Sequence, residues 1–355
     1  MLKLILSYFF FIPKFFPHIT FKQNIRPYFG VPKRNYGGPS LRTSKMIKVY
    51  GNYFFSPNII YAQSWWTERE LVDSINYAKK NNVSIIFNQN GWFYPAWYQG
   101  KWKKRNKLIV DVHKLSKMVI YQSNFCKNAS KELNNYYKNS SLVIHNPSLI
   151  EKKNKIIKNK IFNILLTGIF GKDSKHILMP ALKAINHIEE NKLASFEFKL
   201  NIYGVIKNDM KNSNWFKDYL DLFSKLKSKK KVYFHGKYSH KTIHEILNNT
   251  NLAIHIKYKD PCPNAVIEKL QYGIQHIYSN SGGTPELIGD AGYPINVKNV
   301  WNEMVAVNYK VLAKKIILAK KNEKVMKKKA FKQSKKFRNN KYINIHDKIF
   351  NNLDI

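Results

Sequence analysis

The sequence predicts an α/β protein whose two domains, each built on a parallel sheet, face each other across a cleft. Three observations support this fold class. Strand-like apolar runs alternate with helix-like stretches, the alternation restarts after a lysine-rich segment at residues 148–160, and 355 residues are too many for one ordinary core. We expect a first domain over residues 1–150, a second over 151–330, and helices over 331–355 that pack back toward the first domain. In such sheets, ligands bind in the loops that follow the strands.

The expected elements alternate in both halves. The first half contains expected strands at residues 47–55, 58–66, 83–91, 117–123 and 141–147, and expected helices at 68–82, 108–116 and 124–137. The second half contains expected strands at residues 161–168, 196–204, 231–236, 251–258 and 275–281, with a helix at 177–190 after a loop at 169–176. The strands are short apolar runs, whereas the helices repeat apolar positions with a period near 3.6. This order favours parallel pairing within each half.

The composition fits packed cores in a reducing compartment. Hydrophobic residues make up 44% of the chain, which is ample for globular domains. The two cysteines, Cys126 and Cys262, match no metal-ligand spacing and indicate no disulfide framework, so we expect a cytoplasmic protein. The N-terminal run MLKLILSYFFFIP has no small-residue cleavage site and is too short to cross a bilayer. It predicts a buried first strand, with an interfacial anchor as the alternative.

The chain is strongly basic, with 61 Lys and Arg against 22 Asp and Glu and a net charge of +39. Only six of the basic residues are arginines, which argues against a specific nucleic-acid reader. Residues 310–341 carry fourteen basic residues and one acid, which favours attachment to an anionic membrane surface. The lysine excess, together with abundant Asn and Ile, is also typical of drift in an AT-rich genome, so both origins of the charge stay open.

The stretch DPCPNAVIEKLQYG at residues 260–273 is the strongest candidate for a ligand site. Asn264 suits the start of a helix, where free backbone N–H groups favour an anion such as a diphosphate. Glu268 follows about one turn later among apolar residues, and a carboxylate there can accept hydrogen bonds from two ribose hydroxyls. Asp260, just before the helix, could reach sugar hydroxyls. The alternative is that both acids are ordinary helix and cap residues.

A glycine pair follows the next expected strand. Gly282 and Gly283 allow the backbone to approach a ligand closely. Thr284, Pro285 and Glu286 are typical of a helix start, with a cap residue, a proline at the first position and an acid in the first turn. A plain turn before a well-capped helix is the alternative.

Together these stretches resemble the signature of the family 4 (group 1) glycosyltransferases, which are retaining enzymes of the GT-B type with two Rossmann-like domains. That signature has two acids separated by seven residues, then a glycine, then a GGxPE loop. Here it corresponds to Asp260, Glu268, Gly273 and residues 282–286, with aspartate where the family usually has glutamate. The resemblance implies that Glu268 binds the ribose of a nucleotide sugar.

Residues 164–185 resemble the first strand of the family's donor domain and the loop that binds the donor phosphates. Gly168 matches the pattern, and Ile169 stands where the family has arginine. Lys175 stands at the family's lysine, and Lys172 is a nearby substitute cation, so the resemblance implies that these lysines bind the diphosphate. Lysine is a suitable point charge for a leaving diphosphate, although each could be an ordinary solvated lysine. The resemblance places His235 and Gly236 near the nucleotide base.

In the first domain, Gly37 and Gly38 resemble the glycine-rich loop that faces the donor from the acceptor side. Many family members carry a histidine after an inner strand of this domain, where this chain has Asn88, Gln89 and Asn90. These amides, followed by the aromatic Trp92, would suit a sugar acceptor, with simple packing as the alternative. We therefore expect these six residues on the acceptor side.

The expected activity is transfer of a sugar from a nucleotide-sugar donor to a hydroxyl of a glycan or lipid-linked glycan, with retention, in bacterial surface polysaccharide synthesis. We assign catalysis to Lys175, Asp260 and Glu268, and donor binding also to Asn264 and to the loop at 282–284. No Asp-x-Asp motif occurs, so neither a metal nor another cofactor is expected. The alternatives are another enzyme on the same scaffold, an epimerase or a phosphorylase, and a non-catalytic polyanion-binding protein.

Overall fold

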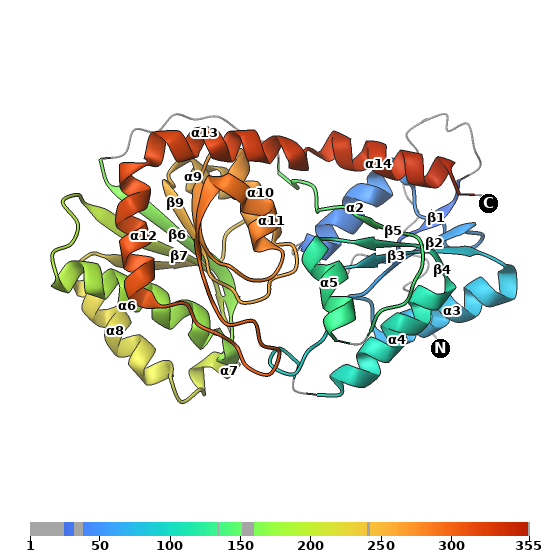
Figure 1. The fold of residues 1–355 in the computed structure, drawn as a ribbon, viewed down its shortest axis with the longest axis horizontal. Coiled ribbons are helices and arrows are strands. Elements are labelled where there is room, and N and C mark those ends of the chain that lie inside the picture. The colour runs from blue at the N-terminus through green and yellow to red at the C-terminus, as the bar shows by residue number, and fades with distance from the viewer. Residues whose placement is uncertain are drawn as a thin grey trace.

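The protein has two α/β domains side by side, each with helices packed around a parallel sheet (Figure 1). The computed structural model describes residues 25–31, 38–98, 100–133, 135–150, 160–239 and 242–353. Every paired strand in both sheets runs parallel to its neighbour. The fold class predicted from the sequence is therefore confirmed. The expected strand at the N-terminus lies outside the described residues.

The first domain contains a five-stranded sheet in the order β1-β2-β3-β4-β5. Its strands are β1 (Pro27–Tyr28), β2 (Ile59–Gln63), β3 (Ser84–Gln89), β4 (Ser116–Tyr121) and β5 (Ser141–Val143), and its helices are α2 (Gly38–Tyr50), α3 (Glu68–Asn81), α4 (Trp102–Leu115) and α5 (Asn124–Glu132). Alternate residues of each inner strand enter different cores: Phe87 packs on one face of the sheet and Ile86 on the other. Both faces are thus covered, as parallel sheets require.

One predicted strand of the first domain is wrong. Residues 47–50 of the expected strand at 47–55 belong to helix α2, and the remainder forms a loop. The β-branched and aromatic residues of this stretch favour a strand locally, but Met46 and Tyr50 are both buried one helical turn apart. Gly51 then ends the helix at a φ of +78°, and its N–H donates to the carbonyl of Ile47.

The second domain contains a six-stranded sheet in the order β11-β10-β9-β6-β7-β8. Its strands are β6 (Phe162–Phe170), β7 (Phe198–Ile206), β8 (Val232–Gly236), β9 (Leu252–His255), β10 (Gln275–Ser279) and β11 (Gly292–Ile295). Its helical elements are η1 (Lys172–Ser174), α6 (Lys175–Glu190), α7 (Asn208–Lys211), α8 (Phe216–Ser228), α9 (Ile243–Asn248), α10 (Asn264–Gln271), α11 (Thr284–Ile288), η2 (Gly289–Ala291), α12 (Tyr309–Lys321) and α13 (Glu323–Ser334). The order of strands reverses between β9 and β6, and ligands of open α/β sheets bind at such a reversal.

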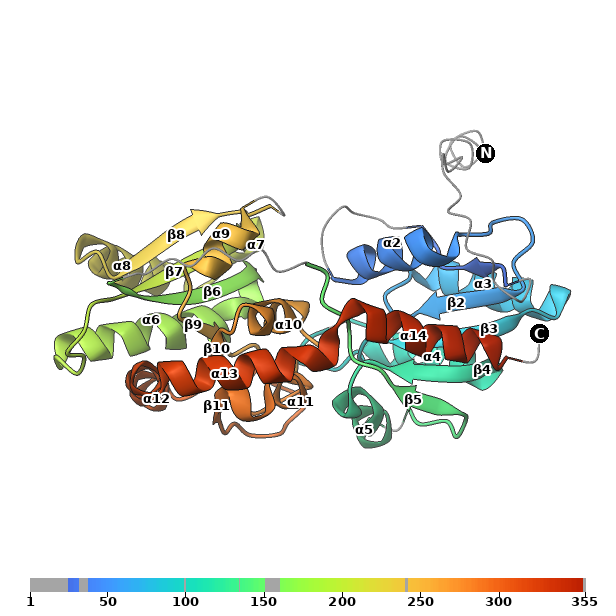
Figure 2. The same cartoon turned by 90° about the horizontal axis from the view of Figure 1, so that it is seen from above.

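The chain returns to the first domain at its C-terminal end. Helix α13 runs along the second domain and continues through η3 (Lys335–Phe337) into α14 (Asn339–Asn351), which lies against the first domain (Figure 2). Tyr342, Ile349 and Phe350 of α14 share a core with Phe29 and with side chains of α2. This crossing ties the two domains together. Among the helices of the described residues, none combines the length and the apolar character that a membrane span needs.

Candidate active site

The candidate site lies where the carboxyl ends of β9 and β6 face the first domain. The loop after β9 leads into α10, and backbone of the first domain approaches it closely. A Cβ atom added to Gly38, at the start of α2, would lie 2.5 Å from the amide nitrogen of Asn264. A Cβ atom added to Gly91 would lie 2.7 Å from the ring of Pro261. Glycine therefore lets the first domain contact the loop that carries the two predicted acids.

Asp260 is a nearly buried carboxylate held by two basic side chains. Its Oδ2 atom lies 3.1 Å from Lys257 Nζ and 3.4 Å from His255 Nε2. Burial alone would raise the pKa of Asp260, but the neighbouring Lys257 and His255 outweigh burial and hold the pKa well below its usual range. The carboxylate is therefore ionised. Its side chain is only 13% exposed, so most of it faces protein.

Glu268 lies in the second turn of α10 and is partly buried. Burial raises the pKa of its carboxyl group to about 7, against the opposing charges of Lys269 and Lys45. Lys269 is itself buried and donates a 2.7 Å hydrogen bond to Thr167, and burial lowers its pKa to about 8. Within the described residues, no hydrogen bond from the protein reaches the carboxylate of Glu268. A carboxylate in this position can accept hydrogen bonds from a ligand.

Two further predicted residues have polar atoms without protein partners. Both side-chain polar atoms of Asn264, and the hydroxyl of the fully buried Thr284, make no hydrogen bond within the described part of the chain. Buried polar groups normally find partners, so these atoms are suited to a ligand or to ordered water. Asn264 begins α10, and Thr284 begins α11. The two helices contact each other, which places both side chains at one end of the second domain.

The glycine pair serves a packing role inside the protein. Gly282 has a φ of +69°, and a Cβ atom there would lie 2.4 Å from the carbonyl oxygen of Asp260. A Cβ atom on Gly283 would lie 1.9 Å from the carbonyl oxygen of Pro261, where the two loops are hydrogen-bonded. The close approach predicted at these glycines therefore occurs between two loops of the site. Their contact with a ligand stays a prediction.

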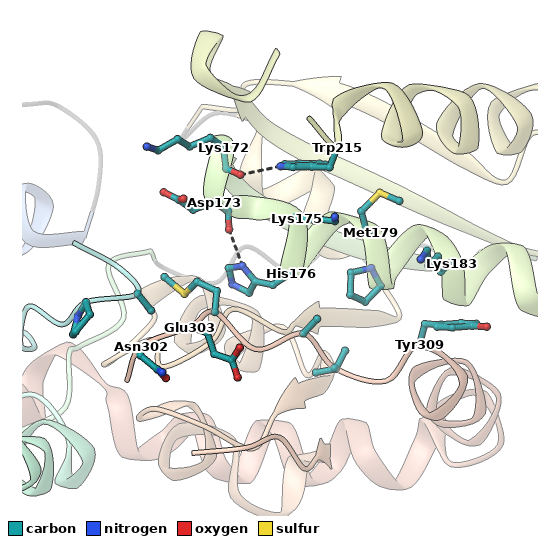
Figure 3. Close-up of a pocket in the computed structure, with 16 residues that line it drawn as sticks. Lys172, Asp173, Lys175, His176, Met179, Lys183, Trp215, Asn302, Glu303 and Tyr309 are labelled. Carbon is teal, nitrogen blue, oxygen red and sulfur yellow. Dashed lines mark hydrogen bonds between the residues drawn. The ribbon is translucent and has the colours of Figure 1, made fainter. Parts of the chain in front are cut away.

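Lys172 and Lys175 line a pocket of about 640 Å³ between α6 and the loop at 302–309 (Figure 3). The pocket also exposes Lys183 and two carboxylates, Asp173 and Glu303. The residues of the first domain that reach it are Pro95 and Ala96. The structure thus brings both predicted lysines together, with Lys172 in η1 and Lys175 at the start of α6. Helix α6 packs on α8 and α12, whereas α10 packs on α11 and α13. Gly168 lies on β6, and a Cβ atom added to Gly204 of the neighbouring β7 would lie 1.8 Å from the carbonyl oxygen of Gly168.

His235 and Gly236 lie at the end of β8, near the same edge of the sheet. The His235 ring stacks on Tyr203 at 4.3 Å between centroids, and its Nε2 atom lies 2.9 Å from Asn201 Oδ1. Gly236 has a φ of +73° and open space around it. Burial, and then the charge of Glu268, raise the pKa of the following Tyr238 to about 12. This coupling places the loop after β8 within electrostatic reach of Glu268.

The predicted acceptor residues lie mostly inside the first domain. Asn88 and Gln89 are 1% and 0% exposed, and Trp92 is also buried, with its indole N–H donating to the carbonyl of Cys126. Asn90 accepts a hydrogen bond from Arg42. The expected stacking of an acceptor on Trp92 therefore does not fit this structure, because its ring is part of the core. Gly37 lies outside the described residues.

Sequence reasoning missed two residues that organise the site. Arg42 on α2 is buried and donates hydrogen bonds to the side chains of Asn146, Gln63 and Asn90. Lys257 forms the ion pair with Asp260 described above. The role of Arg42 could not be predicted from sequence, because its amide partners lie 21 to 104 residues away in the chain. Lys257 carried a usable signal, since it is a lysine that directly follows the strand-like run at residues 252–256.

The comparisons with known proteins agree with this architecture. Residues 174–342 match the family model described as glycosyl transferases group 1. The sucrose-phosphate synthase of Thermosynechococcus elongatus has a similar structure, with a TM-score of 0.65 and 13% identity over 88% of this chain and 77% of that chain. The Anabaena protein HepE in complex with UDP has a TM-score of 0.64 and 13% identity over 89% and 82% of the two chains.

A lipopolysaccharide outer core galactosyltransferase, WaaB, is also similar, with a TM-score of 0.57 and 13% identity over 88% of this chain and 80% of that chain. No curated protein matches the chain in sequence. At these identities the structural likeness establishes the GT-B fold. The family model matches just under half of the chain, most of it in the second domain.

Proposed function

We propose that this chain is a retaining glycosyltransferase that transfers a sugar from a nucleotide sugar to a hydroxyl of a glycan or lipid-linked glycan. One observation carries the proposal. Glu268 presents a carboxylate that receives no hydrogen bond from the part of the chain that the structure describes. It lies eight residues after the held carboxylate Asp260, in the helix that follows the reversal of strand order in the second domain. A vicinal diol of a ribose fits a carboxylate of this kind. The solved structures of HepE contain UDP or UDP-glucose, which supports a nucleotide-sugar donor here.

The reaction requires stabilisation of a leaving diphosphate and alignment of the acceptor. Lysine side chains and the start of α10 supply positive charge on that side of the site, so we propose a reaction that needs neither a metal nor another cofactor. Lys172 and Lys175 are candidates for the diphosphate, with Asn264 and the loop at 282–284 beside it. Unchanged turnover in the presence of EDTA would agree with this part of the proposal, whereas loss of turnover that Mg²⁺ restores would overturn it.

Thermal stabilisation by nucleotides tests the donor site directly. A ligand that binds only the folded protein must raise its Tm. We expect one of UDP, GDP or ADP to raise the Tm of the wild type and to lose that effect in Glu268→Ala. Glu68→Ala, at an exposed position of α3 in the first domain, is the control and should respond like the wild type. Failure of all nucleotides and their sugar conjugates to shift a folded wild type would overturn the proposal.

We further propose that the enzyme works in the cytoplasm at an anionic membrane surface, on precursors of a surface polysaccharide. The likeness to a lipopolysaccharide galactosyltransferase suggests this acceptor class. Helix α13 and η3 carry a lysine stripe, whose exposed members are Lys324, Lys327, Lys328, Lys329, Lys332, Lys335 and Lys336. The exposed Val325 lies within the stripe, and the helix spans one side of the molecule (Figure 2). Such a stripe attracts anionic head groups.

Vesicle pelleting tests this attachment. The wild type should sediment with phosphatidylserine-containing vesicles at low salt and not with purely zwitterionic ones. Lys328→Glu with Lys332→Glu should abolish sedimentation, whereas the same charge change at the exposed Lys79 and Lys80 of α3 should have little effect. Equal loss of sedimentation in the two double variants would indicate a response to net charge alone. It would contradict attachment through the lysine stripe of α13 and η3. Preferential binding of this stripe to RNA would favour the polyanion-binding alternative.

A further inference from the structure

Lys257 lies in the loop of the candidate site, two residues after the end of β9. It follows β9 at the reversal of strand order, and its neighbours in the chain are buried while its own side chain is 50% exposed. The last paired residues of β6 and β9 are Leu166 and Ile254. Three residues beyond them come Ile169 and Lys257. Ile169 is apolar and 58% exposed, so Lys257 supplies the positive charge at these two strand ends.

The ammonium group of Lys257 is held in place by a buried anchor. Asp260 Oδ2 lies 3.1 Å from Lys257 Nζ, and the Asp260 side chain is largely covered by protein. His255 contacts the same oxygen from the interior at 3.4 Å, where burial lowers the pKa of its ring. Lys257 Nζ is the closer of the two partners of this carboxylate, at 3.1 Å. Because an ammonium has three N–H donors, the exposed part of Lys257 keeps donors for a ligand.

The charge of Lys257 acts on both sides of the strand ends. On the α6 side, burial lowers the pKa of His176 to about 4. The positive charge of Lys257 also lowers this pKa, whereas a hydrogen bond to the backbone of Asp173 raises it. On the α10 side, Asp260 lies four residues before Asn264, the first residue of that helix. The side-chain amide of Asn264 makes no hydrogen bond within the described residues. A cation that follows β9 and pairs with the loop before α10 favours a polyvalent anion.

We propose that Lys257 binds the diphosphate of the nucleotide sugar and that Asp260 is the residue that positions it. This inference rests on the proposed function. In the transfer, the bond between the anomeric carbon and the diphosphate oxygen breaks with its electron pair on that oxygen. The acceptor oxygen forms the new bond to carbon, and its proton passes to the departing diphosphate. Lys257 remains protonated throughout and stabilises the charge that grows on the leaving group.

The comparison of nucleoside monophosphate and diphosphate binding tests the role of Lys257. The probes are the mono- and diphosphates of the nucleoside that stabilises the wild type, titrated by calorimetry. Lys257→Met should weaken diphosphate binding roughly ten- to hundredfold, the value of a charge-assisted hydrogen bond, and leave monophosphate binding within about twofold. Lys114→Met is a matched control, because Lys114 also pairs with an aspartate three residues away and is 52% exposed. It should behave as the wild type.

A double-mutant cycle tests the role of Asp260. If Asp260 acts through Lys257, Asp260→Asn weakens diphosphate binding in the wild type and has no further effect in Lys257→Met. If Asp260 instead contacts the sugar, Asp260→Asn weakens nucleotide-sugar binding equally in both backgrounds, which overturns the positioning role. Retained monophosphate binding shows that each variant is folded.

The outcomes separate this inference from the proposed function. Unchanged diphosphate affinity in Lys257→Met, beside intact binding by the wild type, overturns the inference alone. Absence of nucleotide binding by the wild type overturns the proposed function and this inference with it. Equal losses for monophosphate and diphosphate in Lys257→Met would also overturn it, because they would place the cation elsewhere than at the second phosphate.

Discussion

The carboxylate of Glu286 accepts a 2.8 Å hydrogen bond from the backbone N–H of Asn124, across the boundary between the two domains. Asn124 is the first residue of α5, and the next backbone N–H, from Phe125, donates to the same carboxylate at 2.7 Å. Helix α5 has no acid of its own in its first turn. Glu286 thus supplies the negative charge that the start of a helix favours, and it does so from the second domain.

Glu286→Gln should loosen this contact. A hydrogen bond to a charged group contributes about 1.5–3 kcal/mol, so we expect a loss of roughly 2 kcal/mol in the free energy of unfolding, measured with urea. A lower Tm with the two domains moving further apart in small-angle scattering would identify the lost contact. Glu68→Gln, in the first turn of α3 within one domain, is the control. Equal stability of both variants would contradict a domain-spanning cap.

The same carboxylate predicts an acid-sensitive interface. Burial alone would raise the pKa of Glu286, but hydrogen bonds from His145 and from the start of α5 outweigh it and lower the pKa below its ordinary value of 4.5. A lowered pKa means that the contribution to stability is present above pH 4.5 and is lost as pH falls through the folded-state value. The free energy of unfolding, measured from pH 6 to pH 3, should therefore fall more steeply with falling pH in the wild type than in Glu286→Gln. Parallel curves would refute the prediction.

Glu268 should make nucleotide binding dependent on pH near neutrality. Its pKa is raised to about 7 by burial, and the ionised carboxylate is the stronger acceptor because both of its oxygens can accept from the two ribose hydroxyls. Affinity for the stabilising nucleotide should therefore rise about tenfold between pH 6 and pH 8. Glu268→Gln should bind weakly at both pH values and show only the pH dependence of the phosphate itself. A wild-type affinity that follows the Glu268→Gln profile would sink this prediction.

The unliganded protein should show the opposite trend in stability. Because the folded-state pKa of Glu268 is raised, its contribution to stability is complete below the ordinary value of 4.5 and is lost as pH rises through about 7. Glu268→Gln removes this loss. The variant should therefore gain stability relative to the wild type between pH 5 and pH 8 in thermal unfolding. A constant difference across this range would indicate that the carboxyl group is not buried as described.

The second domain was predictable from sequence because its strands are short apolar runs separated by clear helices. The sequence 260–289 combined Asp260, Glu268 and a glycine pair in one stretch, so local spacing predicted their proximity. Helix α2 was not predictable in this way, since its β-branched and aromatic residues favour a strand and only the tertiary burial of Met46 and Tyr50 decides for a helix.

The burial of the predicted acceptor amides was equally hidden. Asn88 and Gln89 are polar residues at the end of a strand, a position that often faces a ligand. Their partners, Tyr61 and His113, are 27 and 24 residues away in sequence and meet them only in the folded sheet. The cap formed by Glu286 spans 162 residues and two domains. Sequence patterns record local periodicity, whereas these contacts depend on how distant elements are brought together.

Gly283 should be far less tolerant of substitution than Gly236. A Cβ at position 283 would lie 1.9 Å from a backbone oxygen, so the two loops would have to separate. We expect Gly283→Ala to cost about 1–3 kcal/mol and to weaken nucleotide binding. Gly236 has a positive φ but open space, so Gly236→Ala should cost only about 1 kcal/mol of backbone strain. Thermal unfolding and nucleotide titration measure both, and a reversed order would contradict the packing role of Gly283.

Arg42 should be the arginine on which stability depends most. Its guanidinium is buried and donates to Asn146 at 2.5 Å, to Gln63 at 2.9 Å and to Asn90 at 3.2 Å. Among the described residues no carboxylate lies within ion-pair distance, so amide oxygens alone satisfy it. Arg42→Met leaves those acceptors unpaired and should cost at least about 3 kcal/mol.

Arg42 also connects α2 to the site loop, because Asn146 donates in turn to the carbonyl of Cys262 at 3.1 Å. The control is Arg26→Met, since Arg26 Nε donates to the carbonyl of Ser56 at an exposed position. That variant should lose less than about 1 kcal/mol in urea unfolding. Arg42→Lys should remain near the Met variant, because one ammonium cannot reproduce the planar fork of donors. Full stability of Arg42→Lys would show that charge, and not the geometry of the fork, supports this junction between the domains.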